Sequence, residues 1–212
     1  MDGFDQQVLA LGFGRRDDAL VRQIADVPAD HPFAPEIRRM FAPRSGEAGA
    51  SAVFLHGGAP LACLVDTASL PPDQANRRQA LRRFCRRLWN QNLASVVLVL
   101  GTDTIEAHSV LDPDSAPQTV SVSVAAEDGP WSQADLASGR AWERQSGWFD
   151  PKLRVDNSLL ENIVALLRVL CGAPGVTEDE ARHALAKAIF VSFLEQRGIV
   201  GDEYRQLHEV EP

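Results

Sequence analysis

No stretch of this sequence is long and apolar enough to cross a membrane. The longest strongly apolar run, Ser95–Leu100, falls far short of the ~20 residues that a spanning helix needs. The N-terminus also lacks a positively charged segment followed by an apolar stretch, which is the pattern of a secretory signal peptide. The sequence therefore predicts a cytoplasmic protein without a membrane partner.

Metal-ligand patterns are missing as well. The three cysteines, Cys63, Cys85 and Cys171, are odd in number and share no ligand spacing, and the five histidines show none either. Nothing in the sequence resembles a nucleophile next to a catalytic base. We therefore expect reduced and buried thiols, no bound metal and no cofactor.

Lysine is scarce, since Lys152 and Lys187 are the only lysines among the 21 basic residues. The net charge of −8 argues against a chain that binds polyanions over its whole surface, but it allows a local basic patch. Such a patch occurs between Arg77 and Arg87, where six arginines fall within eleven residues.

The arginine-rich segment has the spacing of an amphipathic helix. Apolar Leu81, Phe84 and Leu88 share one side of it, and five arginines spread over about half of the circumference on the other. These five are Arg78, Arg82, Arg83, Arg86 and Arg87. Two interpretations stay open: a face that contacts DNA phosphates, or a solvated helix face paired with acidic surface elsewhere.

The first two thirds of the sequence predict a mixed α/β fold. A glycine pair at positions 57 and 58 separates two short apolar runs and indicates a β-hairpin, and Asp73 can cap the helix that follows it. The predicted helices are 5–26, broken by a turn, one or two turns from Pro35, 74–90 and 132–137. The predicted strands are 51–56, 60–66, 95–100, 104–110 and an edge strand around 120–124.

The last third is predicted to be helical. One helix starts at residue 156 or 157 and stops before Gly172. A second helix starts at Thr177, where Thr177 and Glu180 fit a capping box, and this helix ends before Gly198. The two make a helical hairpin whose apolar faces must pack on each other or on another surface. The predicted organisation is an α/β domain at 1–125, a linker at 126–155 and the hairpin at 156–212.

Three short sequence segments resemble the region that precedes the catalytic domain of DNA adenine methyltransferases from restriction-modification and phage-defence systems. They are Leu88–Ala94 leading into Val96–Leu100, Phe149–Asp156 with the following Leu159 and Leu160, and Phe190–Ile199. The glycine-rich cofactor loop and the Asn/Asp-Pro-Pro-aromatic motif of those enzymes are absent, because the only Pro-Pro pair lies between Leu70 and Asp73. The resemblance implies a non-catalytic module whose methyltransferase domain belongs to the same or another chain.

The front half also resembles the PD-(D/E)xK nuclease core, in which a hairpin carries the metal-binding acids and a lysine. When Val65–Ala68 is aligned on the second strand, Asp66 takes the place of the acid and Ala68 that of the lysine. The first acid, expected near Ser51 or Ala52, is missing. The fold is therefore expected to be a degenerate restriction-endonuclease-like mixed sheet, followed by a helical hairpin, with Asp66 as a vestigial catalytic residue.

Large aromatic side chains gather in the predicted linker, where they are unusual unless they are covered. We interpret them either as clamps between the two halves or as a surface that docks a partner. They are Trp131, Trp142, Trp148 and Phe149.

Three functions follow from these observations. The first is a non-catalytic DNA-contacting or assembly module of a methyltransferase-based defence system, with DNA and a methyltransferase domain or another defence protein as partners. The second is a stand-alone protein-interaction subunit of a defence complex. The third is a metal-dependent DNA nuclease whose active site has migrated. In the first two, the chain by itself is not an enzyme.

Overall fold

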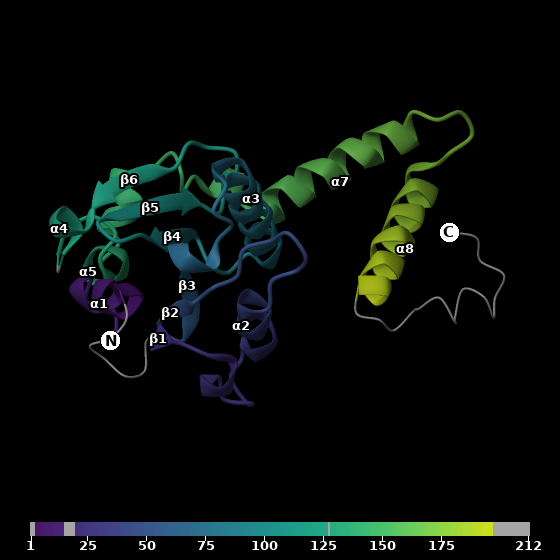
Figure 1. The fold of residues 1–212 in the computed structure, drawn as a ribbon. Coiled ribbons are helices and arrows are strands. Elements are labelled where there is room, and N and C mark those ends of the chain that lie inside the picture. Colours follow the sequence, from purple (N-terminus) through teal and green to yellow (C-terminus); the bar gives the residue numbers. More distant parts are fainter. Residues whose placement is uncertain (1–2, 15–19, 127, 197–212) are drawn as a thin grey trace. The chain divides into compact units, whose positions relative to one another are not determined.

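A computed structural model describes residues 3–14, 20–126 and 128–196 of the chain. The chain forms two compact units, residues 1–156 and residues 157–212 (Figure 1). The first unit contains one sheet with helices on both of its faces, and the second contains a pair of helices. The predicted mixed α/β class is therefore confirmed at this level.

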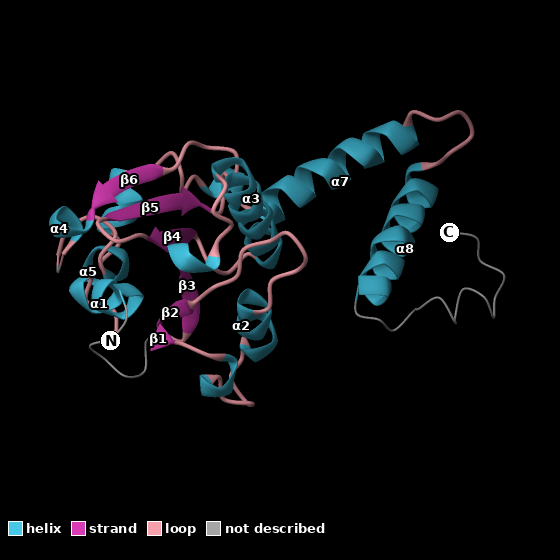
Figure 2. Ribbon diagram, in the orientation of Figure 1, coloured by secondary structure: helices cyan, strands magenta, loops and turns pink. Residues whose placement is uncertain are grey.

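The sheet has six strands, and their order across the sheet is the same as their order along the chain (Figure 2). Every neighbouring pair is antiparallel except the central pair, β3 and β4, which is parallel. The strands are β1 (Leu20–Val21), β2 (Ala52–His56), β3 (Ala59–Asp66), β4 (Val96–Leu100), β5 (Thr104–Ser109) and β6 (Gln118–Ser121). Because β3 and β4 are parallel and in register from Ala62↔Val96 to Asp66↔Leu100, their carboxyl ends lie side by side.

The hairpin of β2 and β3 is confirmed, and its turn explains the glycine pair. Gly57 and Gly58 have φ angles of 58° and 81°, a combination that two-residue hairpin turns of the favoured type require. A residue with a Cβ atom adopts such angles only at a cost, so this turn depends on glycine.

Helix α3 (Gln74–Gln91) makes the crossover that a parallel pair of strands needs. Its first turn is capped by Asp73, whose carboxylate accepts a hydrogen bond from the backbone nitrogen of Asn76 at 2.9 Å. Its last turn ends at Asn92, which has a left-handed φ of 53°. The predicted helix is therefore confirmed at both ends to within one or two residues.

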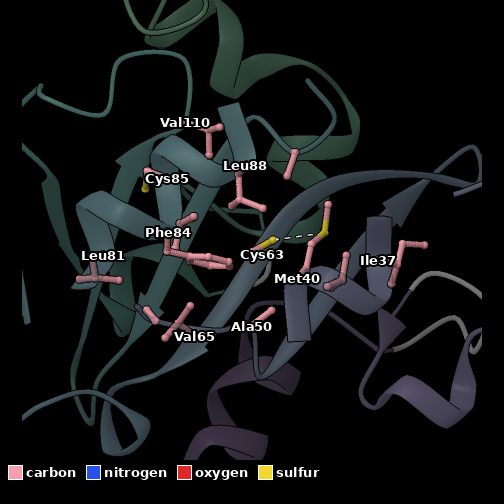
Figure 3. Packing of buried hydrophobic residues seen from close by; sticks show 14 of the residues in the cluster. Ile37, Met40, Ala50, Cys63, Val65, Leu81, Phe84, Cys85, Leu88 and Val110 are labelled. Atoms are coloured by element: carbon pink, nitrogen blue, oxygen red, sulfur yellow. Dashed lines mark hydrogen bonds between the residues drawn. The ribbon is translucent and has the colours of Figure 1, made fainter. Parts of the chain in front are cut away.

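One face of the sheet is covered by α3 together with α2 (Ala34–Phe41). Figure 3 shows the side chains of these helices meeting those of β3, where the thiol of Cys63 lies 3.8 Å from the sulfur of Met40. Burial raises the pKa of the Cys85 thiol to about 12, so this thiol stays protonated at neutral pH. The expectation of buried thiols is confirmed for Cys63 and Cys85, whereas Cys171 is exposed.

The other face of the sheet is covered by α1 (Gly3–Ala10), α5 (Gln133–Ala137) and α6 (Arg140–Arg144). Strand β4 is buried on both faces, since Val97 and Val99 join the first core while Val96, Leu98 and Leu100 join the second. This accounts for its uninterrupted apolar sequence.

Two predicted elements differ from the structure. Residues 20–26, predicted as the second part of a helix, form β1 and a short 3-10 turn at Ile24–Asp26, because Leu20 and Val21 pair with the edge of β2. The predicted edge strand ends at Ser121, and Val122–Ala125 form the short helix α4. The predicted C-terminal glycine of the last helix, Gly198, lies outside the described residues.

The segment predicted as a linker packs on the sheet as part of the first unit. Trp131, Leu136 and Ala141 from this segment are fully buried in the second core. A 3-10 turn at Pro151–Leu153 then leads to the second unit, and the carbonyl of Leu153 accepts a hydrogen bond from the indole nitrogen of Trp89 at 2.7 Å.

The helical pair consists of α7 (Val155–Cys171) and α8 (Glu178–Gln196). The predicted capping box of α8 is present, since Thr177 Oγ1 accepts from the Glu180 backbone nitrogen at 3.3 Å and the Glu180 carboxylate accepts from the Thr177 nitrogen at 2.9 Å. Among the described residues, no helix combines the length and apolar character that a bilayer crossing requires.

Candidate functional site

The outward face of α3 is the most concentrated basic surface that the sequence predicts. Its apolar side is anchored in the first core by Leu81, Phe84 and Leu88, which fixes the opposite side toward solvent. The side chains of Arg82 and Arg86 are 53% and 57% exposed, and Arg78 and Arg83 are exposed as well.

Asp114, in the loop after β5, binds two arginines of this face. Its carboxylate pairs with the guanidinium of Arg82 and, at 3.3 Å, with that of Arg86. Desolvation alone would raise the pKa of Asp114, but the hydrogen bonds from Arg82 and Arg86 lower the pKa below its ordinary value. The single negative charge of Asp114 thus offsets only one of the two arginine charges. The cluster of Arg82, Arg86 and Asp114 keeps a net positive charge.

Arg78 and Arg83 differ from their neighbours. Neither forms a salt bridge with any residue that the structure describes, and both side chains are exposed, although a terminal guanidinium nitrogen of Arg83 lies close to Gly46. These two are therefore the best placed arginines of the face for binding an external anion.

Arg87 does not belong to this surface, contrary to the prediction. Its side chain is only 12% exposed and pairs with Glu47 at 3.2 Å. One guanidinium nitrogen also donates to the carbonyls of Arg39 and Ala42, each at 2.8 Å. Arg87 therefore holds the loop after α2 against α3, and its donors are not available to DNA.

A pocket of about 660 Å³ lies at the carboxyl ends of β3 and β4, the position where open α/β sheets commonly bind ligands. Helix α1 forms one wall, and Asp66, Thr67 and Gly101 contribute from the strand ends. The Thr67 hydroxyl donates to the carbonyl of Leu100 at 2.7 Å, and the Gln7 amide donates to the carbonyls of Gly101 and Thr102.

Asp66 faces this pocket, but its surroundings differ from a nuclease centre. The backbone nitrogen of Asp66 donates to Ser51 Oγ at 2.9 Å, so Ser51 does lie beside it, where the alignment expects the first acid. Strand β3 ends at Asp66, and Ala68 lies in a 3-10 turn at Thr67–Ser69 that the Asp66 carboxylate caps at 2.9 Å. The predicted strand 60–66 is therefore confirmed, but the alignment that places Thr67 and Ala68 on the second strand is not, because both residues lie beyond the end of β3.

Asp66 is the only carboxylate among the described residues that line this pocket. Nowhere in 3–14, 20–126 or 128–196 do three histidine, cysteine, aspartate or glutamate side chains gather as they would around a metal ion. The PD-(D/E)xK nuclease core, by comparison, holds its metal ion with two carboxylates.

The aromatic residues of segment 131–149 stack in pairs against the second core. The rings of Trp131 and Trp148 are 5.6 Å apart, and those of Trp142 and Phe149 are 4.8 Å apart. Trp131 has no exposed surface, so it cannot contact a docking partner. The interpretation of Trp131 as a docking residue is therefore wrong. Trp142, Trp148 and Phe149 are half-buried, and their role in docking stays a prediction.

An ion pair between the buried Asp135 and the partly exposed Arg144, next to Trp131, was not anticipated from the sequence. The Arg144 guanidinium makes two hydrogen bonds to the Asp135 carboxylate, at 2.9 and 2.6 Å, and the Trp131 backbone nitrogen donates a third at 2.9 Å. Burial alone would raise the pKa of Asp135, but these hydrogen bonds lower it below its ordinary value. Ser132 followed by Asp135 is a helix-start pattern that could have indicated this site.

The helical pair presents an apolar surface of a kind that folded domains normally cover. Nine of the twelve large hydrophobic side chains that are exposed in the described residues belong to it. They are Leu159, Leu160, Val164, Leu166, Val169, Val176, Ile189, Phe190 and Val191.

Comparisons with known proteins do not assign the chain to a family. No protein-family model, no curated protein and no solved structure matches the chain.

Proposed function

We propose that this chain is a non-catalytic, DNA-contacting module of a restriction-modification or phage-defence system built around a DNA adenine methyltransferase. The observation that carries the proposal is the outward face of α3, on which Arg78, Arg82, Arg83 and Arg86 are exposed while the opposite side is fixed in the core. A rigid helix that holds several guanidinium groups along one side suits the regularly spaced phosphates of a DNA backbone.

The surroundings of Asp66 support the non-catalytic part of the proposal. A restriction-endonuclease-like ancestry would explain the hairpin, the crossover helix and an acid at the end of β3, while the alanine at position 68 and the serine at position 51 would explain a loss of hydrolysis. In this interpretation the sheet serves as a scaffold that presents α3.

The test is a measurement of affinity for a fluorescently labelled DNA duplex by anisotropy at several salt concentrations. The variant R78E/R83E changes the two arginines without a salt bridge among the described residues. R168E/K187E, on the exposed surface of the helical pair, changes the total charge by the same amount. We expect only R78E/R83E to weaken binding strongly and to reduce the slope of log affinity against log salt by about 2, because each phosphate contact contributes about 0.9.

Equal losses in the two variants would mean that overall charge rather than the α3 face governs binding, and the proposal would then fail. Magnesium- or manganese-dependent cleavage of the same duplex that disappears in Asp66→Ala would instead favour the nuclease hypothesis.

A second candidate function is a protein-interaction subunit of a defence complex. It is favoured by the exposed apolar side chains of α7 and α8, since surfaces of this kind usually mark a protein interface. A stable complex with a methyltransferase or another defence protein, formed without any affinity of the chain for DNA, would support it over the first.

A further inference from the structure

The apolar surface of α7 is wider than one neighbouring helix can cover. Successive residues of a helix are about 100° apart around its axis. On such a projection the large apolar side chains of α7 fill an arc of roughly 220°, with Val169 at one edge and Val164 at the other. A helix that packs on a single neighbour needs an apolar stripe of only about 100°. Complete packing of α8 on α7 would therefore still leave about half of this arc uncovered.

Helix α8 has the same property along its second half. Ile189, Phe190 and Val191 follow one another and are all exposed, at 42%, 61% and 46%. Successive residues of a helix point about 100° apart, so these three side chains face three different directions. These directions span an arc wider than the stripe of about 100° that packing on a single neighbouring helix needs.

The exposed apolar area also has the size of a stable interface. The nine exposed side chains, at roughly half exposure each, present on the order of 800 Å² per chain, which is one side of a standard protein interface. Packing of α8 on α7 within one chain would use part of this area, and the remainder would be buried against the second copy.

The distribution of charge favours a second copy as the occupant. Glu161 and Arg168 are seven residues apart, so they share the side of α7 opposite the apolar arc, and between Leu159 and Leu170 that arc contains no charged residue. Helices that select a different partner usually do so through charges beside the apolar face. An uncharged face meets its own copy without repulsion, and two-fold pairing brings the same surface from both chains together.

We propose that α7 and α8 of two chains pack into a four-helix bundle, so that this protein is a homodimer through its helical pair. The inference goes beyond the proposed function, and it is tested without DNA, so that either can fail while the other holds.

The experiment is the molar mass of the full chain by light scattering or sedimentation equilibrium over a concentration series. The variant L160E/V169E places charges within the apolar arc, and E161A/R168A alters the opposite side of the same helix as a matched control. We expect a dimer for the unchanged chain and for E161A/R168A. We expect the L160E/V169E dimer to dissociate with a dissociation constant at least about 100-fold higher.

Circular dichroism and the unfolding transition of the first unit provide the folding control, because neither hydrophobic core of that unit contains a residue of the helical pair. A monomer at every concentration up to about 100 μM would overturn the proposal and assign the apolar surface to another protein. A dimer that L160E/V169E leaves intact would also overturn it, because the interface would then lie elsewhere.

Discussion

Residues of one type have opposite roles within one turn of α3. Arg83 and Arg87 are four positions apart on the same helix, yet Arg83 is exposed and Arg87 is enclosed by the loop after α2. Periodicity predicted that both point away from Leu81 and Phe84, which holds for Arg83 but not for Arg87, whose guanidinium lies 5.2 Å from the centre of the Phe84 ring. It could not predict that residues 39–48 fold over one of them, because that depends on a loop whose path no local pattern encodes.

This difference leads to a prediction for stability. Arg87→Ala removes the donors to the carbonyls of Arg39 and Ala42 and the partner of Glu47, so we expect it to lower the free energy of unfolding by about 2 kcal/mol. Arg83→Ala, on the exposed side, should change it by less than about 0.5 kcal/mol. Urea denaturation of both variants provides the measurement, and equal effects would contradict the structural role of Arg87.

Elements were predicted from the sequence with uneven success, and the reasons are physical. The β2–β3 hairpin and α3 carry their own signals, namely the glycine pair at the turn and the Asp73 cap. Strand β1 has only two residues and exists because Leu20 finds a partner in Phe54, more than thirty positions away. Pairing at such a distance leaves no local trace, which is why a helix was predicted there.

The cap of α3 offers a test at this scale. Asp73→Ala removes the acceptor for the Asn76 backbone nitrogen, and we expect a loss of about 1 kcal/mol in the free energy of unfolding. Asp73→Asn keeps an acceptor oxygen and should restore most of that stability. Thermal or urea unfolding of the two variants measures the difference. If the alanine and asparagine variants were equally destabilised, charge rather than capping would be responsible.

For the whole molecule, the decisive feature is that the buried hydrophobic side chains are confined to one unit. Apart from Ala181, every such side chain in the described part of the chain lies within residues 1–156. The candidate site follows the same division, since the basic face and the pocket belong to the first unit and the wide apolar surface to the second. The sequence indicated the basic face and the helical pair, but not the pocket, which forms only when β3 and β4 align.

A fragment of residues 1–156 should therefore fold by itself. We expect it to unfold in one cooperative transition in urea, with a midpoint close to that of the first unit in the full chain, because no core contact of the sheet is lost. Residues 157–212 alone should show helical structure that depends on concentration. A fragment 1–156 without cooperative unfolding would show that the helical pair is needed for the core.

The agreement between strand order in space and strand order along the chain has a consequence for synthesis on the ribosome. Each strand from β2 onward finds its neighbour already made when it emerges, and the α-helices that lie between pairing strands are α2, between β1 and β2, and α3, between β3 and β4. The sheet can thus grow from its N-terminal edge at the pace of translation, with no early strand waiting for a late one. Its β2–β3 hairpin would be assembled before the first residue of α7 leaves the exit tunnel.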